Sequence, residues 1–413
     1  MSARLRIERL GAQGDGVAST ETGPVFVRYA LPGEMVTAAR QKDRAELVSV
    51  LEPSPQRVEP PCRHFGICGG CAIQHLETGA YNGWKRDKVV NALAAAGIDA
   101  PVGDIVPCAP HTRRRVVMAA RRTEAGMLLG YYEAMSHRIV AIEECPISRP
   151  EIVGRLDDLR ALTALVAASS EPFRVTVTST ASGLDVAVDD SGKLSDEARL
   201  KAADFAGRTG FARLSVGGEI VVEPKRPVVM FGDIAVEPPP GAFLQATAEA
   251  EAAMADLVLE HLGGAKRTAD LFSGSGTFAL RLAAKAEVHA VESHAAPLAA
   301  LDRACRFAVG LRRVTVEKRD LFRRPLTVKE LEHFDGLVFD PPRAGAEDQA
   351  KQIARSAIPK VAAVSCNPVT LVRDLAILVA GGYRVTRVTP IDQFLWSPHV
   401  EAVALLEKPK RKR

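Results

Sequence analysis

Past Gly241 the sequence alternates short apolar segments with stretches of helical composition, and this alternation narrows the possible folds more than any other feature. Apolar segments lie at 268–272, 314–318, 337–339 and 361–364. Such alternation is typical of an α/β domain with a mostly parallel sheet. The carboxyl ends of its strands share one edge, and ligands bind in the crevice outside that edge. We therefore predict an α/β domain over 238–413 with its site at this edge.

Several of these predicted strands end in residues suited to a ligand. The strand at 268–272 leads into Ser-Gly-Ser-Gly-Thr, whose small residues let the backbone approach a nucleotide. Glu292 follows about twenty residues later, where an acid meets a ribose diol. Asp320 and Asp340 end the next two strands. Each acid alone could cap a helix, but together they predict a nucleotide-type site.

A cysteine ends the following strand, in Ser-Cys-Asn-Pro at 365–368, just before a predicted helix. An isolated cysteine is most often buried in a core. Amide groups at a helix N-terminus stabilise a thiolate, however, and the thiolate is the nucleophilic form. Cys366 is therefore a candidate nucleophile. His399-Val400-Glu401 then precedes an apolar final strand at 402–406.

Four other cysteines form a separate pattern: Cys62, Cys68 and Cys71 with two glycines between the last two, and Cys145 followed by proline. Four thiolates suit either a zinc ion or an iron–sulfur cluster, and scattered core thiols are a third reading. The Cys-Pro partner favours a [4Fe-4S] cluster. With four cysteines every iron is ligated, which favours a structural role over radical chemistry.

The rest of the chain predicts two further units. Residues 1–54 alternate apolar and polar positions between glycine-rich turns, which predicts a small all-β barrel. Residues 172–237 are again strand-like, so the expected units are 1–54, 55–237 with the four cysteines, and 238–413. The N-terminus resembles no signal peptide and no apolar window suits a membrane helix, so we expect a cytoplasmic protein with reduced thiols.

The net charge of +4 is a weak argument for a nucleic-acid partner, so any such signal is local. Two basic patches stand out, and each is either a phosphate contact or merely solvated surface. They are the five arginines Arg113, Arg114, Arg115, Arg121 and Arg122, and the tail KPKRKR at 408–413.

Taken together, these motifs resemble the RNA uracil-5-methyltransferase family, most closely its 23S ribosomal RNA branch, over essentially the full chain. Ser-Cys-Asn-Pro with the downstream His-Val-Glu is specific to that family; Asp-Pro-Pro-Arg at 340–343 and the glycine turn are less so. The segment from Gly14 to Val36 resembles a TRAM domain, an OB-like RNA-binding barrel. The implied architecture is a TRAM barrel, a central β domain carrying the cysteine cluster, and a class I (Rossmann-like) methyltransferase domain.

The resemblance also implies cofactors, partner and roles. It implies S-adenosylmethionine and a [4Fe-4S] cluster as cofactors, RNA as partner, and a monomer. Cys366 is implied as nucleophile and Glu401 as base. The implied cluster ligands are Cys62, Cys68, Cys71 and Cys145, and the implied cofactor contacts are Gln245, Phe272, Thr277, Glu292, Asp320 and Asp340. The chain departs from the family at Thr277, where relatives often carry Asn, and in Leu-Trp-Ser-Pro at 395–398.

The expected chemistry explains these residue types. Addition of the Cys366 thiolate to C6 of uracil makes C5 nucleophilic, and Glu401 then removes the C5 proton. The target uridine must be flipped out or lie in a loop. Two alternatives stay open. An exocyclic-amine methyltransferase typically carries an aromatic residue where Arg343 stands, and a cluster-bearing RNA-binding or assembly factor needs no reactive site.

Overall fold

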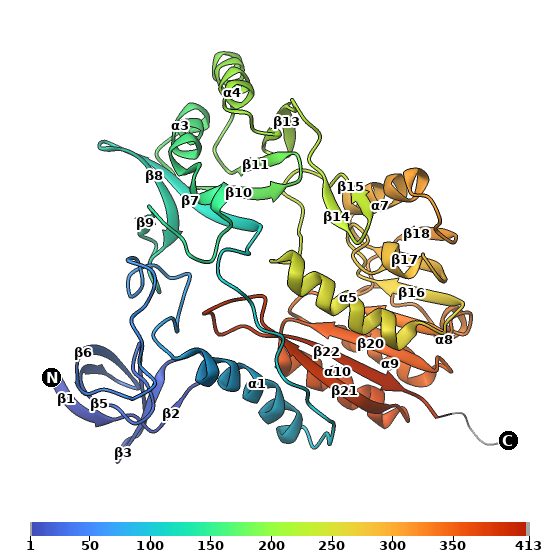
Figure 1. Ribbon diagram of the computed structural model, residues 1–413, viewed down its shortest axis with the longest axis horizontal. Helices are drawn as coiled ribbons and strands as arrows, with labels where there is room; N and C mark the ends of the chain where they lie inside the picture. Colours follow the sequence, from blue (N-terminus) through green and yellow to red (C-terminus); the bar gives the residue numbers. More distant parts are fainter. Residues whose placement is uncertain (1, 410–413) are drawn as a thin grey trace.

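The computed structural model describes residues 2–409, which form three large sheets with flanking helices (Figure 1). The N-terminal sheet has six strands in the order β1-β5-β6-β4-β3-β2. Its apolar side chains, among them Leu5, Val25 and Val36, alternate with exposed ones and form a separate small core. The strands are β1 (Ser2–Arg6), β2 (Arg9–Leu10), β3 (Gly16–Thr20), β4 (Gly23–Val27), β5 (Met35–Gln41) and β6 (Arg44–Glu52).

The middle unit is a seven-stranded sheet in the order β13-β12-β11-β10-β7-β8-β9. Its helices bury their apolar residues in the core of this sheet, such as Leu159 and Leu162 of α3, and were not anticipated from the strand-like sequence. The elements are β7 (Arg115–Thr123), β8 (Gly126–Tyr132), β9 (Ile139–Ala141), α2 (Pro150–Val153), α3 (Leu156–Val166), β10 (Phe173–Thr180), β11 (Gly183–Asp189), α4 (Asp196–Thr209), β12 (Arg213–Val216) and β13 (Glu219–Val222).

The C-terminal unit is the predicted α/β domain, a seven-stranded sheet in the order β18-β17-β16-β19-β20-β22-β21. Strands β16 to β20 are parallel to one another, and β22 is antiparallel to both β20 and β21. The strands are β16 (Arg267–Leu271), β17 (Glu287–Glu292), β18 (Val314–Lys318), β19 (Gly336–Phe339), β20 (Lys360–Ser365), β21 (Arg384–Ile391) and β22 (Glu401–Glu407).

Helices cover both faces of this sheet, so each face has its own apolar core. One face packs against α5 (Ala248–Leu262), α6 (Ala279–Leu282) and α7 (Ala295–Phe307). The other packs against α8 (Val328–Leu331), α9 (Glu347–Arg355) and α10 (Pro368–Ala380). Burial on both faces explains why the central strands read as continuous apolar runs.

Two segments between the expected boundaries 55 and 237 pack on the C-terminal unit. Helix α1 (Thr78–Ala95) buries Val89 and Leu93 in the same core as α10, and the chain after it bridges Val102 to Val388 of β21. The hairpin of β14 (Val229–Phe231) and β15 (Ile234–Val236) joins the opposite core. The cysteine-rich segment just before α1 is thereby brought to the C-terminal sheet. Across residues 2–409 no helix is long and apolar enough to cross a membrane.

Candidate active site

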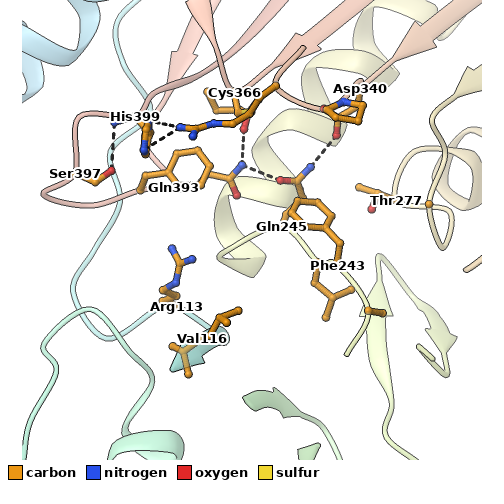
Figure 2. A pocket seen from close by; sticks show the side chains of 18 of the residues that line it. Arg113, Val116, Phe243, Gln245, Thr277, Asp340, Cys366, Gln393, Ser397 and His399 are labelled. Atoms are coloured by element: carbon orange, nitrogen blue, oxygen red, sulfur yellow. Dashed lines mark hydrogen bonds between the residues drawn. The ribbon is translucent and has the colours of Figure 1, made fainter. Parts of the chain in front are cut away.

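One cavity of about 1510 Å³ runs from the carboxyl edge of the C-terminal sheet to the middle unit. All twelve residues singled out from the sequence line it. These are Cys62, Cys68, Cys71, Cys145, Gln245, Phe272, Thr277, Glu292, Asp320, Asp340, Cys366 and Glu401. Residues from three widely separated parts of the chain therefore face one space, and Figure 2 shows part of its lining.

The glycine turn after β16 is built to leave room for a ligand. A Cβ atom on Gly276, whose φ is +99°, would lie 2.5 Å from Leu301, so only glycine fits there without displacement. The hydroxyl oxygens of Ser273 and Ser275 are buried, line the cavity and have no hydrogen-bond partner within residues 2–409. Buried polar atoms of this kind suit a polar ligand that pairs with them.

Glu292 is held beside this turn by backbone amides. The amide of Gly274 donates to its carboxylate at 3.1 Å, and the amide of His294 donates at 2.9 Å. Burial raises the pKa of Glu292, but these hydrogen bonds and those from the His294 and Ser293 side chains outweigh it, so the pKa lies below its usual range. An ionised, fixed carboxylate suits the hydroxyls of a ribose.

An aromatic pair lines the next part of the cavity. The rings of Phe272 and Phe322 lie 5.6 Å apart, and Asp320 accepts a hydrogen bond from the amide of Phe322 at 3.0 Å. Aromatic surface in the same cavity as the carboxylates of Glu292 and Asp320 fits a nucleoside, whose base is flat and whose sugar carries hydroxyls.

Four side chains that line the cavity form a hydrogen-bonded chain, and Figure 2 labels Asp340, Gln245 and Gln393 among them. Gln245 donates to Asp340 at 2.8 Å, while Gln393 donates to Gln245 at 2.7 Å and to Glu401 at 2.6 Å. The amide of Ala246 donates to Gln393 at 2.8 Å. Sequence reasoning gave Gln393 no role, because a glutamine after a strand matches no motif. Its position links the two carboxylates through neutral amides.

Cys366 lies between the end of β20 and the start of α10, as the sequence predicted. Burial raises the pKa of its thiol to about 11, and the charges of Glu401 and Asp340 add to this, while Arg343 opposes it. The thiolate is therefore scarce near neutral pH unless positive charge enters the cavity.

Glu401 begins β22 and is buried. Burial, then the charge of Asp340, raises its pKa well above the usual value, against the hydrogen bond from Gln393. Burial also raises the pKa of Asp340 to about 7, although the hydrogen bond from Gln245 lowers it. The Oε1 atom of Glu401 is buried and has no hydrogen-bond partner in the described part of the chain. That atom is available to accept a proton from a ligand.

Arg343 and His399 also line the cavity, and Figure 2 labels His399. The guanidinium of Arg343 donates to the imidazole of His399, with 2.6 Å between Nη2 and Nδ1. Burial, followed by the charge of Arg343, lowers the pKa of His399 to about 4, so its imidazole is neutral near pH 7. The sequence contained both residues in its motifs but assigned neither a role.

The four cysteines lie together at the other end of the cavity. Burial raises the pKa of the thiols of Cys62, Cys68 and Cys71, the last to about 12, and the neighbouring cysteines contribute to each increase. Within the described residues no group of three or more His, Cys, Asp or Glu side chains is arranged to hold a metal ion. The thiols are thus neighbours that line one wall, without a preformed ion site.

Two members of the arginine cluster, Arg121 and Arg122, are exposed and stay candidates for RNA contact. The phosphate-contact hypothesis is wrong for Arg114. That side chain is buried, and it pairs with Glu251 and donates to the carbonyl oxygen of Gln245 at 3.1 Å. Arg115 likewise donates to the carbonyl oxygen of Ala242 at 2.9 Å. Arg113 lines the cavity and stays a candidate for RNA contact. Residues 410–413 of the basic tail lie outside the described residues.

The strand order, the glycine turn and the acids at successive strand ends define the nucleotide-binding fold of S-adenosylmethionine-dependent methyltransferases. A crystal structure of the Pyrococcus abyssi tRNA (uracil-54, C5)-methyltransferase with S-adenosyl-L-homocysteine superposes with a TM-score of 0.75, covering 98% of this chain and 99% of that chain. At 24% sequence identity this likeness shows the fold.

Sequence comparison defines the family. A family model described as tRNA (Uracil-5-)-methyltransferase matches residues 204–409. An uncharacterized RNA methyltransferase of Mesorhizobium japonicum is 66% identical over all 413 residues. The 23S rRNA (uracil(1939)-C(5))-methyltransferase RlmD of Halomonas elongata is 34% identical over 99% of this chain and 90% of its own length. The chain belongs to the RNA (uracil-5-)-methyltransferase family, whose members use S-adenosylmethionine.

Proposed function

We propose that this protein methylates C5 of a specific uridine in 23S ribosomal RNA through a covalent bond between Cys366 and C6 of the base. The observation that carries the proposal is the meeting of Cys366, Glu401 and Asp340 at the edge of the cavity that the cofactor residues also line. The RNA class rests on the relative named for 23S rRNA, which aligns over nearly the whole chain.

The residues fit S-adenosylmethionine. Glu292 and Asp320 present carboxylates to a ribose, Phe272 and Phe322 present aromatic surface to a base, and unpaired serine hydroxyls lie in the turn. When bound, the cofactor supplies an electrophilic methyl group on a positively charged sulfur. That positive charge also favours the ionised forms of Cys366 and the two carboxylates.

Cys366 begins the reaction by forming a bond from its thiolate sulfur to C6 of the uracil. The electron pair of the C5–C6 double bond moves towards O4, which makes C5 nucleophilic enough to take up the methyl group. C5 then carries both the methyl group and its original proton. Glu401 removes this proton, the C5–C6 double bond reforms, and the Cys366 thiolate leaves.

Glu401 suits the second half of this sequence because its raised pKa makes it a stronger base than an exposed carboxylate. Gln393 holds one of its oxygens and leaves Oε1 unpaired. Gln245 fixes Asp340 in the same way, so that Asp340 lies where it can contact either the cofactor or the imide of the base. An exocyclic-amine methyltransferase has no use for this thiol.

For Cys62, Cys68, Cys71 and Cys145 we propose a [4Fe-4S] cluster. Four neighbouring thiols are the right donor set, and a cube of iron and sulfide keeps its ligands farther apart than one zinc with Zn–S bonds of about 2.3 Å. The proline directly after Cys145 favours the cluster over zinc. We further propose that residues 2–52 form a TRAM-like RNA-binding unit and that the monomer is active, since the cavity is built within one chain.

The test is to map 5-methyluridine in 23S rRNA from a strain that lacks the gene and to add the purified protein back to that RNA. We expect one position to lose its methyl group in the strain and to regain it in vitro. Methylation at an exocyclic amine, or an unchanged ribosomal RNA, would contradict the proposed function.

A further inference from the structure

Helix α1 packs beside β21 (Figure 1). A buried lysine on α1 binds the loop between β21 and β22. The side chain of Lys85 is fully buried. Its ammonium group donates to Asp392 Oδ1 at 2.9 Å, to the carbonyl oxygen of Phe394 at 3.2 Å, and to the carbonyl oxygen of His399. A lysine ammonium group has three protons, so all its donors are used on both ends of this loop.

Tyr81, one turn earlier on the same face of α1, holds the middle of the loop. Its hydroxyl donates to Asp392 Oδ2 at 2.5 Å and accepts from the amide of Trp396 at 2.8 Å. Trp396 has a φ of +57°, in the left-handed region that a tryptophan rarely adopts, so its backbone depends on such contacts.

The cysteine segment holds the same tryptophan from the other side. The amides of Ala72 and Ile73, directly after Cys71, donate to the carbonyl oxygen of Trp396 at 2.8 and 3.2 Å. Helix α1 and the cysteine segment are adjacent in sequence, and both form hydrogen bonds to the same loop.

This loop carries the residues around the proposed base. Asp392 is followed by Gln393, which donates to Glu401, and His399 lies two residues before Glu401. Movement of the loop therefore changes the position of the Glu401 carboxylate relative to the target uracil.

We propose that Lys85 and Tyr81 are positioning residues for Glu401, through which the cysteine segment controls removal of the C5 proton. This inference rests on the proposed function. It assigns a role to α1 that the cofactor site does not require, because α1 contacts the loop and the β21 edge of the sheet rather than the glycine turn.

The test separates two steps in Lys85→Met, which keeps a long unbranched side chain and removes its charge. Methyl transfer is followed in a single turnover with labelled cofactor, and proton removal by tritium release from RNA carrying tritium at C5. We expect tritium release to slow about tenfold or more while methyl transfer changes less than about threefold. Enzyme and methylated RNA then accumulate as a complex that survives denaturing electrophoresis.

Equal slowing of both steps, or no change in either, would overturn the inference. The matched control is Lys88→Met on the same helix, because Lys88 donates to the carbonyl oxygen of Ala12 instead of the loop and should leave both steps unchanged. Tyr81→Phe should act in the same direction as Lys85→Met but more weakly.

If Lys85→Met fails to fold, the Lys85→Met, Asp392→Asn variant replaces it, since no buried carboxylate is then left without its cation. The same split between the two steps is expected, and its absence would refute the inference. Failure of the unmodified enzyme to release any C5 tritium during methylation would instead refute the proposed function and this inference with it.

Discussion

At the scale of single residues, the charges around Cys366 oppose its activation. Glu401 and Asp340 add to the effect of burial on the thiol pKa, whereas Arg343 lowers it. The charge of Arg343 thus favours the thiolate form of Cys366, which is the proposed nucleophile. The hydrogen bond of Arg343 to His399 holds it beside the cavity that both residues line.

Replacing Arg343 with Gln should raise the pKa of Cys366 further. Because the thiolate is the active form, the active fraction at a given pH falls, and the rising limb of the single-turnover pH–rate profile should move to higher pH by roughly half to one pH unit. Arg343→Lys keeps the charge and should keep the profile. A profile that does not move in Arg343→Gln would show that Arg343 has no part in forming the thiolate.

Residue positions were predictable where a local pattern fixes them. Glu292, Asp340 and Cys366 end strands, and the parallel sheet alone brings them to one edge. Lys85 and Gln393 could not be found this way. Lys85 and Asp392 are 307 positions apart in the chain, and Gln393 meets Gln245 across 148 positions, so no local pattern carries either contact.

At the scale of elements, a buried ion triad joins the middle unit to the cofactor site. Glu251 of α5 pairs with Arg114, just before β7, and with Arg281 of α6 at 2.9 Å. Arg281 also donates to the carbonyl oxygen of Thr277 at 2.7 Å, and Arg114 donates to that of Gln245. The triad thereby supports the backbone of two proposed cofactor contacts.

Glu251→Gln should weaken both stability and cofactor binding. Buried Arg114 and partly buried Arg281 lose their shared carboxylate, and breaking a buried ion pair typically costs about 3–5 kcal/mol. We expect S-adenosylhomocysteine to bind roughly tenfold more weakly by calorimetry, about 1.4 kcal/mol. Glu249→Gln, at an exposed position of the same helix, is the control. Unchanged affinity with lowered stability would limit the triad to a structural role.

Strands and helices were predictable where the pattern of apolar residues along the sequence is regular. The predicted strands at 314–318 and 337–339 lie in β18 and β19. Strand β19 is buried and apolar throughout, as parallel strands covered on both faces are, whereas β18 is a partly exposed edge strand. The stretch of helical composition after the glycine turn forms only the short helix Ala279–Leu282, since the chain turns back towards β17. The buried face of α1 could not be predicted from the sequence, because a lysine, Lys85, lies on that face among apolar residues.

At the scale of the whole molecule, one cavity joins the cysteine segment to the reactive edge of the sheet. The two are also joined through the backbone, since Ala72 and Ile73 hold Trp396. Loss of the proposed cluster should therefore affect the proposed active site through this loop rather than through the cofactor pocket.

Cys68→Ser should lower iron and labile sulfide in anaerobically purified protein, together with the rate of methylation. S-adenosylhomocysteine should still bind with nearly unchanged affinity, because none of its proposed contacts lies in this segment. Cys305→Ser is the control, since Cys305 lies in α7 and packs, partly buried, against the core. Stoichiometric zinc without sulfide in the unmodified protein would contradict the cluster.

The central claim is that Cys366 and Glu401 act in turn on one base, and the most direct measurement is the covalent adduct in Glu401→Gln. Attack and methyl transfer remain possible, but the C5 proton stays in place, so enzyme and methylated RNA should migrate together in a denaturing gel. The band should vanish in the Cys366→Ala, Glu401→Gln double variant. If Glu401→Gln forms no Cys366-dependent adduct while the unmodified enzyme methylates the same RNA, the covalent mechanism is wrong.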